Sequence, residues 1–131
     1  MPIVIKRKVA APPPEPVAQK PVKAQVEPLD GMCRVALEAS PNAAIAWWLM
    51  ASYLYYHHDI SILSDGFYDE LAKAMLEAWD ELEHQHKYLI TTDNLRIGSL
   101  FNLAADAYPM RVRGGASHLA ANRGFQIDIR H

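Results

Sequence analysis

Three tyrosines and two of the three aspartates between positions 55 and 69 are the residues of this chain whose types and spacing could do chemistry. Tyr55 and Tyr56 are adjacent, and Asp65 follows ten residues after the first of them. Tyr68 and Asp69 come next, so the two carboxylates stand four residues apart, about one turn of a helix. Tyrosine faces can stack on a flat cationic ring, and carboxylates can offset its charge or accept hydrogen bonds from hydroxyl groups. The cluster therefore predicts a shared pocket with a spacing that nucleotide binding could use.

The same five residues also have a purely structural interpretation. Tyr55 and Tyr68 could belong to the hydrophobic core. Asp65 could stand at a helix N-terminus, where the helix dipole favours a carboxylate, while Asp69 faces solvent. Both interpretations stay open at this point, because the same side chains would keep the fold together.

The elements that must position this cluster are two helices joined by a short turn. Ser40 is a good N-cap and Pro41 a good first residue for a helix to about His58, which is apolar almost all round and should be central. Ser64 should cap a long amphipathic helix over residues 65 to about 86. The pattern predicts a helical hairpin whose connecting turn carries the marked residues.

Further helices are expected on both sides of the hairpin. One short helix should cover residues 31–39, and another should run from the turn at Thr91–Asn94 to Ala107. The predicted fold class is mainly α: a small helical domain over residues 31–108, built on an α-hairpin. Residues 109–131 are predicted to be an irregular C-terminal tail, in which a short helix near 116–122 and a strand at 125–129 are both open.

The N-terminal thirty residues differ in composition from the rest. Residues 1–30 hold seven of the nine prolines and should form an extended, proline-rich arm, because proline removes backbone donors and disfavours helix. The arm is either a passive linker or a segment that docks along a protein partner. Its apolar start, Ile3–Ile5, could add as a short strand to the sheet edge of another protein.

Charge is unevenly distributed and restricts the class of partner. The 131 residues carry a net charge of -2, and half of them are hydrophobic, which is enough for one modest core. Residues 1–30 hold five basic and three acidic side chains, residues 31–93 hold three and ten, and residues 94–131 hold five and two. A direct nucleic-acid contact normally needs a concentrated basic face, so the acidic centre argues against it.

Cysteine content and hydropathy indicate the compartment. Cys33 is the single cysteine and should be a small buried side chain, which favours a reducing compartment such as the cytoplasm. Residues 39–58 lack Asp, Glu, Lys and Arg, but Pro41, Asn42 and the pair His57–His58 favour a buried core helix over a membrane span.

Other candidate sites have weaker patterns. His84 and His86 stand two apart near an expected helix end, where their side chains should point to different faces, so a zinc site is not favoured. Gly114–Gly115, beside two arginines, is expected to be a flexible loop. The chain contains no glycine-rich phosphate loop with the spacing of the known motifs.

The tyrosine and aspartate cluster resembles the small N-terminal Ia domain of bacterial NAD-dependent DNA ligases. The pair Tyr55–Tyr56, the turn carboxylate Asp65 and the dipeptide Tyr68–Asp69 stand at that family's spacing. Downstream, this chain has His86, Leu89-Ile90-Thr91, Asp93 and Arg96-Ile97-Gly98 where the family has similar runs. The resemblance covers about 50 residues and implies a helical fold that binds NAD or its nicotinamide mononucleotide half through Tyr55, Tyr56, Asp65, Tyr68 and Asp69.

The chain departs from the family in three respects. The segment from Asp69 to Asp93 is about four residues longer, roughly one extra helical turn. Phe67 stands where the family often has a glutamate that completes a capping box, so the helix start loses one reciprocal bond. The adenylated lysine of the family's Lys-x-Asp-Gly motif has no counterpart, because Pro28 and Leu63 stand at its position before the two Asp-Gly pairs. The chain is therefore not expected to be a complete ligase, or an enzyme by itself.

Three functions follow as hypotheses. The first is a non-catalytic adaptor or structural module with a ligase Ia-like fold, joined through residues 1–30 to a protein partner, an oligomer or a larger assembly, such as a phage virion if the source is viral. The second is an accessory protein or split ligase subunit that binds NAD or nicotinamide mononucleotide. The third, a nucleic-acid accessory that uses the basic ends, is disfavoured by the acidic centre.

Overall fold

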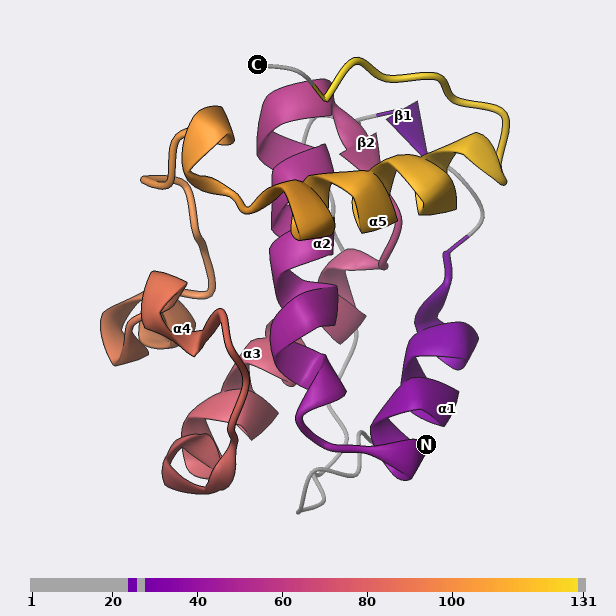
Figure 1. The fold of residues 1–131 in the computed structure, drawn as a ribbon. Coiled ribbons are helices and arrows are strands. Elements are labelled where there is room, and N and C mark those ends of the chain that lie inside the picture. The colour runs from indigo at the N-terminus through magenta and orange to yellow at the C-terminus, as the bar shows by residue number, and fades with distance from the viewer. Residues whose placement is uncertain (1–23, 26–27, 130–131) are drawn as a thin grey trace.

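The computed structural model describes residues 24–25 and 28–129, and this part of the chain is mainly helical, as predicted (Figure 1). Most of the predicted arm, including its proposed docking strand, lies outside the described residues. The helices and strands in chain order are β1 (Ala24–Gln25), α1 (Asp30–Ala39), α2 (Ala43–His58), β2 (Ile60–Ser61), α3 (Asp65–Glu77), α4 (Thr92–Ile97) and α5 (Met110–Ala121). Short 3-10 turns lie at η1 (Trp79–Glu81), η2 (Lys87–Leu89) and η3 (Ala105–Ala107).

α2 is the central helix, and α1, α3 and α5 each pack against it (Figure 1). It begins at Ala43, two residues later than predicted, because the carbonyl oxygens of Ser40 and Pro41 accept turn-type hydrogen bonds first. Its burial on most sides confirms the predicted core helix. Within the described residues, no helix combines the length and apolar character needed to cross a bilayer. The buried side chains of α2 are Ala44, Ile45, Trp47, Trp48, Leu49, Ala51, Ser52, Tyr53 and Leu54.

The turn after α2 is joined to the segment that precedes α1. Asp59 ends α2 in the left-handed conformation, with φ of 59°, which turns the chain sharply into β2. β2 pairs in parallel with β1, in the register Ala24 with Ile60. The backbone N–H of Leu29 then donates to the carbonyl oxygen of Ile62 over 2.7 Å. These hydrogen bonds hold the hairpin turn from a part of the chain about thirty residues away in sequence.

α3 ends at Glu77, and the prediction that it would continue to about His86 was wrong. The ammonium group of Lys87 donates to the carbonyl oxygens of Trp79 and Leu82 over 2.7 and 2.8 Å, and it lies over the Trp79 ring. The amide oxygen of Asn42 accepts a hydrogen bond from the backbone N–H of Glu83. These contacts satisfy the backbone after the helix end, so the chain folds back after η1 without a further α-helical turn.

The C-terminal third also differs from the prediction. α4 ends at Ile97 and does not continue to Ala107, because Gly98 takes the left-handed conformation, with φ of 75°. The expected irregular tail instead contains the twelve-residue helix α5, and Gly114–Gly115 lies within it. A Cβ atom at Gly115 would stand 2.9 Å from the sulfur of Met50, so this helix approaches α2 closely. Residues 125–129 form no strand, but their apolar side chains pack against the core.

Candidate functional site

A cavity of about 170 Å³ lies between α2, α3 and the end of α4. All five residues predicted from the sequence line it: Tyr55, Tyr56, Asp65, Tyr68 and Asp69. The remaining lining residues are Ala51, Ser61, Ile62, Leu63 and Gly98. The hairpin therefore brings the predicted residues together, as their spacing indicated.

The α2 side of the cavity is aromatic. The rings of Tyr55 and Tyr56 are half-buried and nearly perpendicular, with centroids 5.0 Å apart and an interplanar angle of 85°. The hydroxyl of Tyr56 is hydrogen-bonded to the Ser99 hydroxyl over 2.6 Å. This bond ties the end of α2 to the residue that follows Gly98, so it fixes one tyrosine of the wall.

Tyr68 belongs both to the cavity wall and to the core. Its ring stacks on the indole of Trp48, with centroids 5.0 Å apart, and its hydroxyl is hydrogen-bonded to the hydroxyl of Ser52. Burial raises the pKa of the Tyr68 hydroxyl well above its usual value, so the group stays protonated near neutral pH. The structural interpretation therefore holds for most of this side chain, while its remaining surface faces the cavity.

The two carboxylates stand at the cavity rim. Asp65 is the first residue of α3 and Asp69 lies one turn further, and both are exposed. Asp65 lies in the first helical turn, where the dipole stabilises a negative charge. A Cβ atom at Gly98 would be 3.4 Å from Oδ1 of Asp69, so the backbone at the end of α4 approaches this carboxylate closely. A cation in the cavity would lie near both negative charges.

The start of α3 is held by Asp30, a residue that the sequence argument did not single out. The hydroxyl oxygen of Ser64 accepts from the N–H of Phe67, as the predicted N-cap should. The reciprocal bond that Phe67 cannot provide is replaced by Asp30, whose carboxylate accepts from the N–H and the hydroxyl of Ser64 over 3.0 and 2.7 Å. The first turn of α1 thus positions the helix start that carries Asp65.

We expect Asp30→Ala to lower the free energy of unfolding by about 2 kcal/mol, because it removes two charge-assisted hydrogen bonds from a half-exposed site. Urea denaturation followed by circular dichroism measures this change. Glu38→Ala, an exposed change near the other end of α1, is the control and should cost at most about 0.5 kcal/mol. Equal stability of the two variants would show that Asp30 does not hold the turn.

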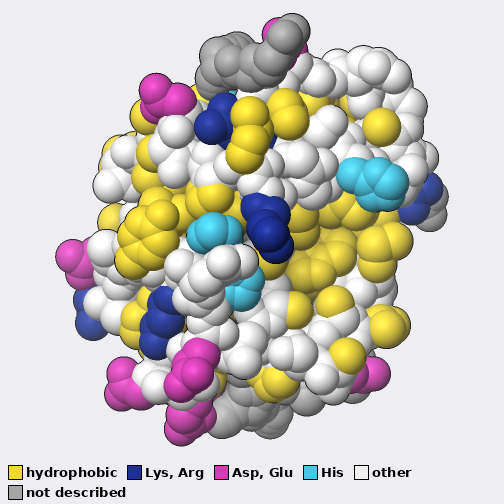
Figure 2. All heavy atoms as spheres, in the orientation of Figure 1, with side chains coloured by type: hydrophobic (Ala, Val, Ile, Leu, Met, Phe, Trp, Pro, Cys, Tyr) yellow, Lys and Arg dark blue, Asp and Glu magenta, His cyan; other side chains and the backbone are white. Residues whose placement is uncertain are grey.

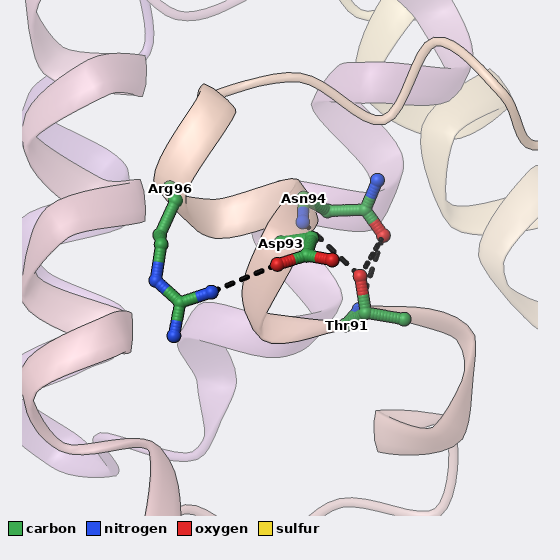
Figure 3. Close-up of polar contacts among 4 residues, drawn as sticks. All are labelled: Thr91, Asp93, Asn94 and Arg96. Atoms are coloured by element: carbon green, nitrogen blue, oxygen red, sulfur yellow. Dashed lines mark hydrogen bonds and ion pairs between the residues drawn. The ribbon is translucent and has the colours of Figure 1, made fainter.

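A second set of contacts beside the cavity lies at α4, where the sequence predicted a cap. Thr91 and Asn94 form a reciprocal capping box, and Asp93 pairs with Arg96 over 2.8 Å (Figure 3). The Asn94 amide also donates to the carbonyl oxygen of Ser99. This confirms the predicted cap at Thr91–Asn94, and it fixes the backbone at Gly98 beside the cavity. The run Arg96-Ile97-Gly98, which is similar to a run in the ligase Ia domain, was the sequence feature that pointed to Gly98.

Gly98→Ala should destabilise the fold by roughly 1–2 kcal/mol, because alanine is strained in the left-handed conformation that this position requires. The matched control is Gly66→Ala in the first turn of α3, where a Cβ meets nothing within 4 Å. That control should be neutral or stabilising by up to about 1 kcal/mol. A thermal melt that ranks the two variants in the opposite order would contradict the role of Gly98.

The histidines near η2 lie closer together than predicted. Because α3 ends early, His84 and His86 are not on a helix, and their ring centroids are 5.4 Å apart. Nδ1 of His84 accepts the backbone N–H of His86 over 3.1 Å. Among the described residues, no three histidine, cysteine, aspartate or glutamate side chains are grouped as a metal site would need. The cavity between α2 and α3 is therefore the stronger candidate site.

Comparison of the chain with protein-family models, with curated proteins and with solved structures found no match. The function therefore has to be inferred from the chemistry of the cavity and from the residues that match the spacing of the ligase Ia domain.

Proposed function

We propose that this chain is a non-catalytic helical module that binds nicotinamide mononucleotide, or that half of NAD, in the cavity between α2 and α3. The observation that carries the proposal is that Tyr55, Tyr56, Asp65, Tyr68 and Asp69 line one cavity. Their spacing along the chain predicts this grouping. The resemblance to the ligase Ia domain is the reason for proposing nicotinamide mononucleotide as the ligand of these five residues.

The chemistry of the cavity suits an oxidised nicotinamide ring. The ring is flat and carries a positive charge, which the faces of Tyr55 and Tyr68 can contact and the carboxylates of Asp65 and Asp69 can offset. The volume of about 170 Å³ is below the ~300–1,000 Å³ of pockets that enclose a drug-sized ligand. We infer that the ring enters the cavity while the ribose and phosphate stay at its open side.

The lining supports binding without catalysis. Among the described residues, it contains no lysine, histidine or cysteine, and its two carboxylates, the remaining groups that could act as a base, are exposed at the rim. The hydroxyl of its serine, Ser61, donates to the carbonyl oxygen of Leu63. The lining therefore offers surfaces and charges for a ligand, and we assign it no reaction.

Isothermal titration calorimetry of the full chain with nicotinamide mononucleotide tests this proposal. We expect saturable binding, and a decrease in affinity of about tenfold in Tyr55→Ala and in Asp65→Ala, since each removes one aromatic or charged contact. The fold of each variant is checked by far-ultraviolet circular dichroism.

The controls use the same residue types away from the cavity. Tyr88→Ala removes a tyrosine that is 74% exposed, and Asp80→Ala removes an exposed aspartate beyond the end of α3. Both variants should bind like the wild type. The proposal is wrong if millimolar nicotinamide mononucleotide gives no heat, or if the control variants lose as much affinity as the cavity variants.

A second proposed function is an adaptor that contacts a protein partner through the N-terminal arm. The observation in its favour is an apolar surface on α1, where Met32 and Val35 are 49% and 66% exposed, three residues apart on one face. Figure 2 shows hydrophobic side chains gathered between α1 and α5. The residues of this surface directly follow the N-terminal arm in the sequence, so the arm and α1 could contact one partner together.

Pull-down from the native source tests the adaptor function. Val35→Glu should reduce recovery of a partner at least as much as deletion of residues 1–23, whereas Glu38→Gln on the same helix should not change it. If Val35→Glu and the deletion variant both retained the same partner, the adaptor function would be contradicted. The proposal of nucleotide binding would not be affected.

A further inference from the structure

Asn94 is a buried polar side chain of α4 that is not among the lining residues of the cavity, yet it is connected to the cavity wall. It is 6% exposed. Its amide oxygen faces Thr91 and accepts from the backbone N–H and the hydroxyl of that residue, over 3.0 and 2.9 Å (Figure 3). Its amide nitrogen donates to the carbonyl oxygen of Ser99 over 3.1 Å and to Oδ1 of Asn102 over 3.2 Å. One side chain therefore joins the residue before α4 to the loop after it.

The loop of residues 98–103 connects Asn94 to a tyrosine of the cavity wall. Its first two residues, Gly98 and Ser99, donate their backbone N–H groups to the carbonyl oxygen of Asn94, over 2.8 and 3.0 Å. The Ser99 hydroxyl is hydrogen-bonded to the Tyr56 hydroxyl over 2.6 Å and accepts from the N–H of Phe101 over 3.1 Å. Both the backbone and the side chain of Ser99 are thus held, and the position of its hydroxyl follows from the bonds to Asn94.

The other end of this loop is attached to α2 independently. The ring Nε2 of His57 donates to the carbonyl oxygen of Leu103 over 2.9 Å. The N–H of Leu103 in turn donates to the carbonyl oxygen of Leu100, whose side chain is buried. Loss of the amide bonds from Asn94 should therefore change the position of Ser99 without detaching the loop from the core.

The orientation of the Tyr56 ring determines the shape of the cavity wall on the α2 side. Tyr56 lines the cavity and is half-buried, and its ring meets the Tyr55 ring edge-on, with an interplanar angle of 85°. A half-buried tyrosine at a helix end has more than one accessible rotamer unless its hydroxyl is held. The bond to Ser99 selects one rotamer before a ligand arrives, which reduces the conformational entropy that binding would otherwise lose.

We propose that Asn94 is a positioning residue of the cavity: through Ser99 it holds the Tyr56 ring in the orientation that a ligand meets. This inference rests on the proposed nicotinamide-binding function and adds to it a residue outside the lining on which affinity depends. Asn94 contacts no ligand and supplies no charge to the cavity. It fixes the place of Ser99 and thereby the rotamer of Tyr56.

Asn94→Asp breaks this connection with the smallest change in shape. A carboxylate can still accept both hydrogen bonds from Thr91, but it cannot donate to the carbonyl oxygen of Ser99. Calorimetry of the full chain with nicotinamide mononucleotide should show an affinity lower by about threefold to fivefold, because Tyr56 must then be ordered on binding. The matched control is Thr91→Ala, which removes the cap on the other side of the same amide. It should lower the thermal midpoint by about 5 °C but leave the affinity unchanged.

Ser99→Ala removes the hydroxyl that Tyr56 contacts, and it serves as the second variant should Asn94→Asp fail to fold. It should also weaken binding by about threefold to fivefold. The double variant should bind no more than about 1.5-fold more weakly than either single variant, because both changes break the same connection. Independent effects would multiply to roughly tenfold or more, and that result would overturn the inference.

Amide hydrogen exchange of the ligand-free protein, followed by nuclear magnetic resonance, tests the connection without a ligand. The N–H of Phe101 donates to the Ser99 hydroxyl, so Asn94→Asp should increase its exchange rate at least about fivefold. The N–H of Tyr68, which donates to the carbonyl oxygen of Ser64 in the first turn of α3, is the internal control and should exchange as in the wild type.

The two measurements separate this inference from the proposed function. Unchanged exchange at Phe101, or unchanged affinity in Asn94→Asp while the wild type binds nicotinamide mononucleotide, would overturn the inference and leave the proposed function in place. If the wild-type chain bound no nicotinamide mononucleotide, both would be removed.

Discussion

Trp48→Ala should destabilise the protein by about 3–5 kcal/mol, the usual cost of removing a large aromatic side chain from a core. Trp48 has no exposed surface and stacks on Tyr68, with centroids 5.0 Å apart and planes inclined by 15°. A small domain is stable by only about 5–15 kcal/mol, so this loss leaves a marginal fold. Urea denaturation followed by circular dichroism measures it. The variant should also lose ligand affinity, because Tyr68 of the cavity wall is positioned by this stacking.

Trp48→Phe is the matched control, and it should cost less than half as much. The indole Nε1 of Trp48 is buried and has no hydrogen-bond partner among the described residues. Phenylalanine therefore removes a polar atom without removing a hydrogen bond. The ring that remains can still stack on Tyr68. If the two variants were equally unstable, the loss would come from the indole itself and not from aromatic packing between α2 and α3.

The hairpin and its cavity were predictable because the signals that define them are local. A helix without charged residues, a short turn and a serine N-cap at Ser64 lie within one stretch of chain. The five predicted residues all belong to this stretch. Their approach to one another requires only that the two helices fold back on each other, which the apolar faces of α2 and α3 promote.

The elements that the sequence did not predict depend on contacts between distant parts of the chain. Asp30 supports Ser64 from 34 residues away, and no pattern around either residue indicates the pairing. α3 ends early because Lys87 and Asn42 bind the backbone beyond it. Gly114–Gly115 lowers the local helix propensity of α5, and its packing on α2 overrides that preference.

Alkaline pH should destabilise the fold from about pH 9 upward, because of Cys33. This side chain has no exposed surface, and burial, with a smaller contribution from Asp30, raises the pKa of its thiol from 9.0 to about 12. The folded state therefore binds this proton more tightly than the unfolded state does. The stabilisation is fully present below pH 9 and is lost as the pH rises from 9 toward 12. A shift of this size corresponds to about 4 kcal/mol over the whole range.

Between pH 8 and pH 10 the thiol of Cys33 dominates, because its ordinary pKa of 9.0 lies one unit below that of the buried tyrosines, whose raised pKa values affect stability mainly above pH 10. We expect the free energy of unfolding to fall by about 1.4 kcal/mol across this window as a result of the thiol. Cys33→Ala should lack this part of the decrease. Subtracting the free energy of unfolding of the variant from that of the wild type removes the contribution of lysines and other groups that titrate in the same pH range. Parallel stability curves for the two proteins would show that the thiol does not lose its proton on unfolding. The native thiol should also react with a disulfide reagent at pH 8 at least tenfold more slowly than in urea, because a buried thiol forms little thiolate.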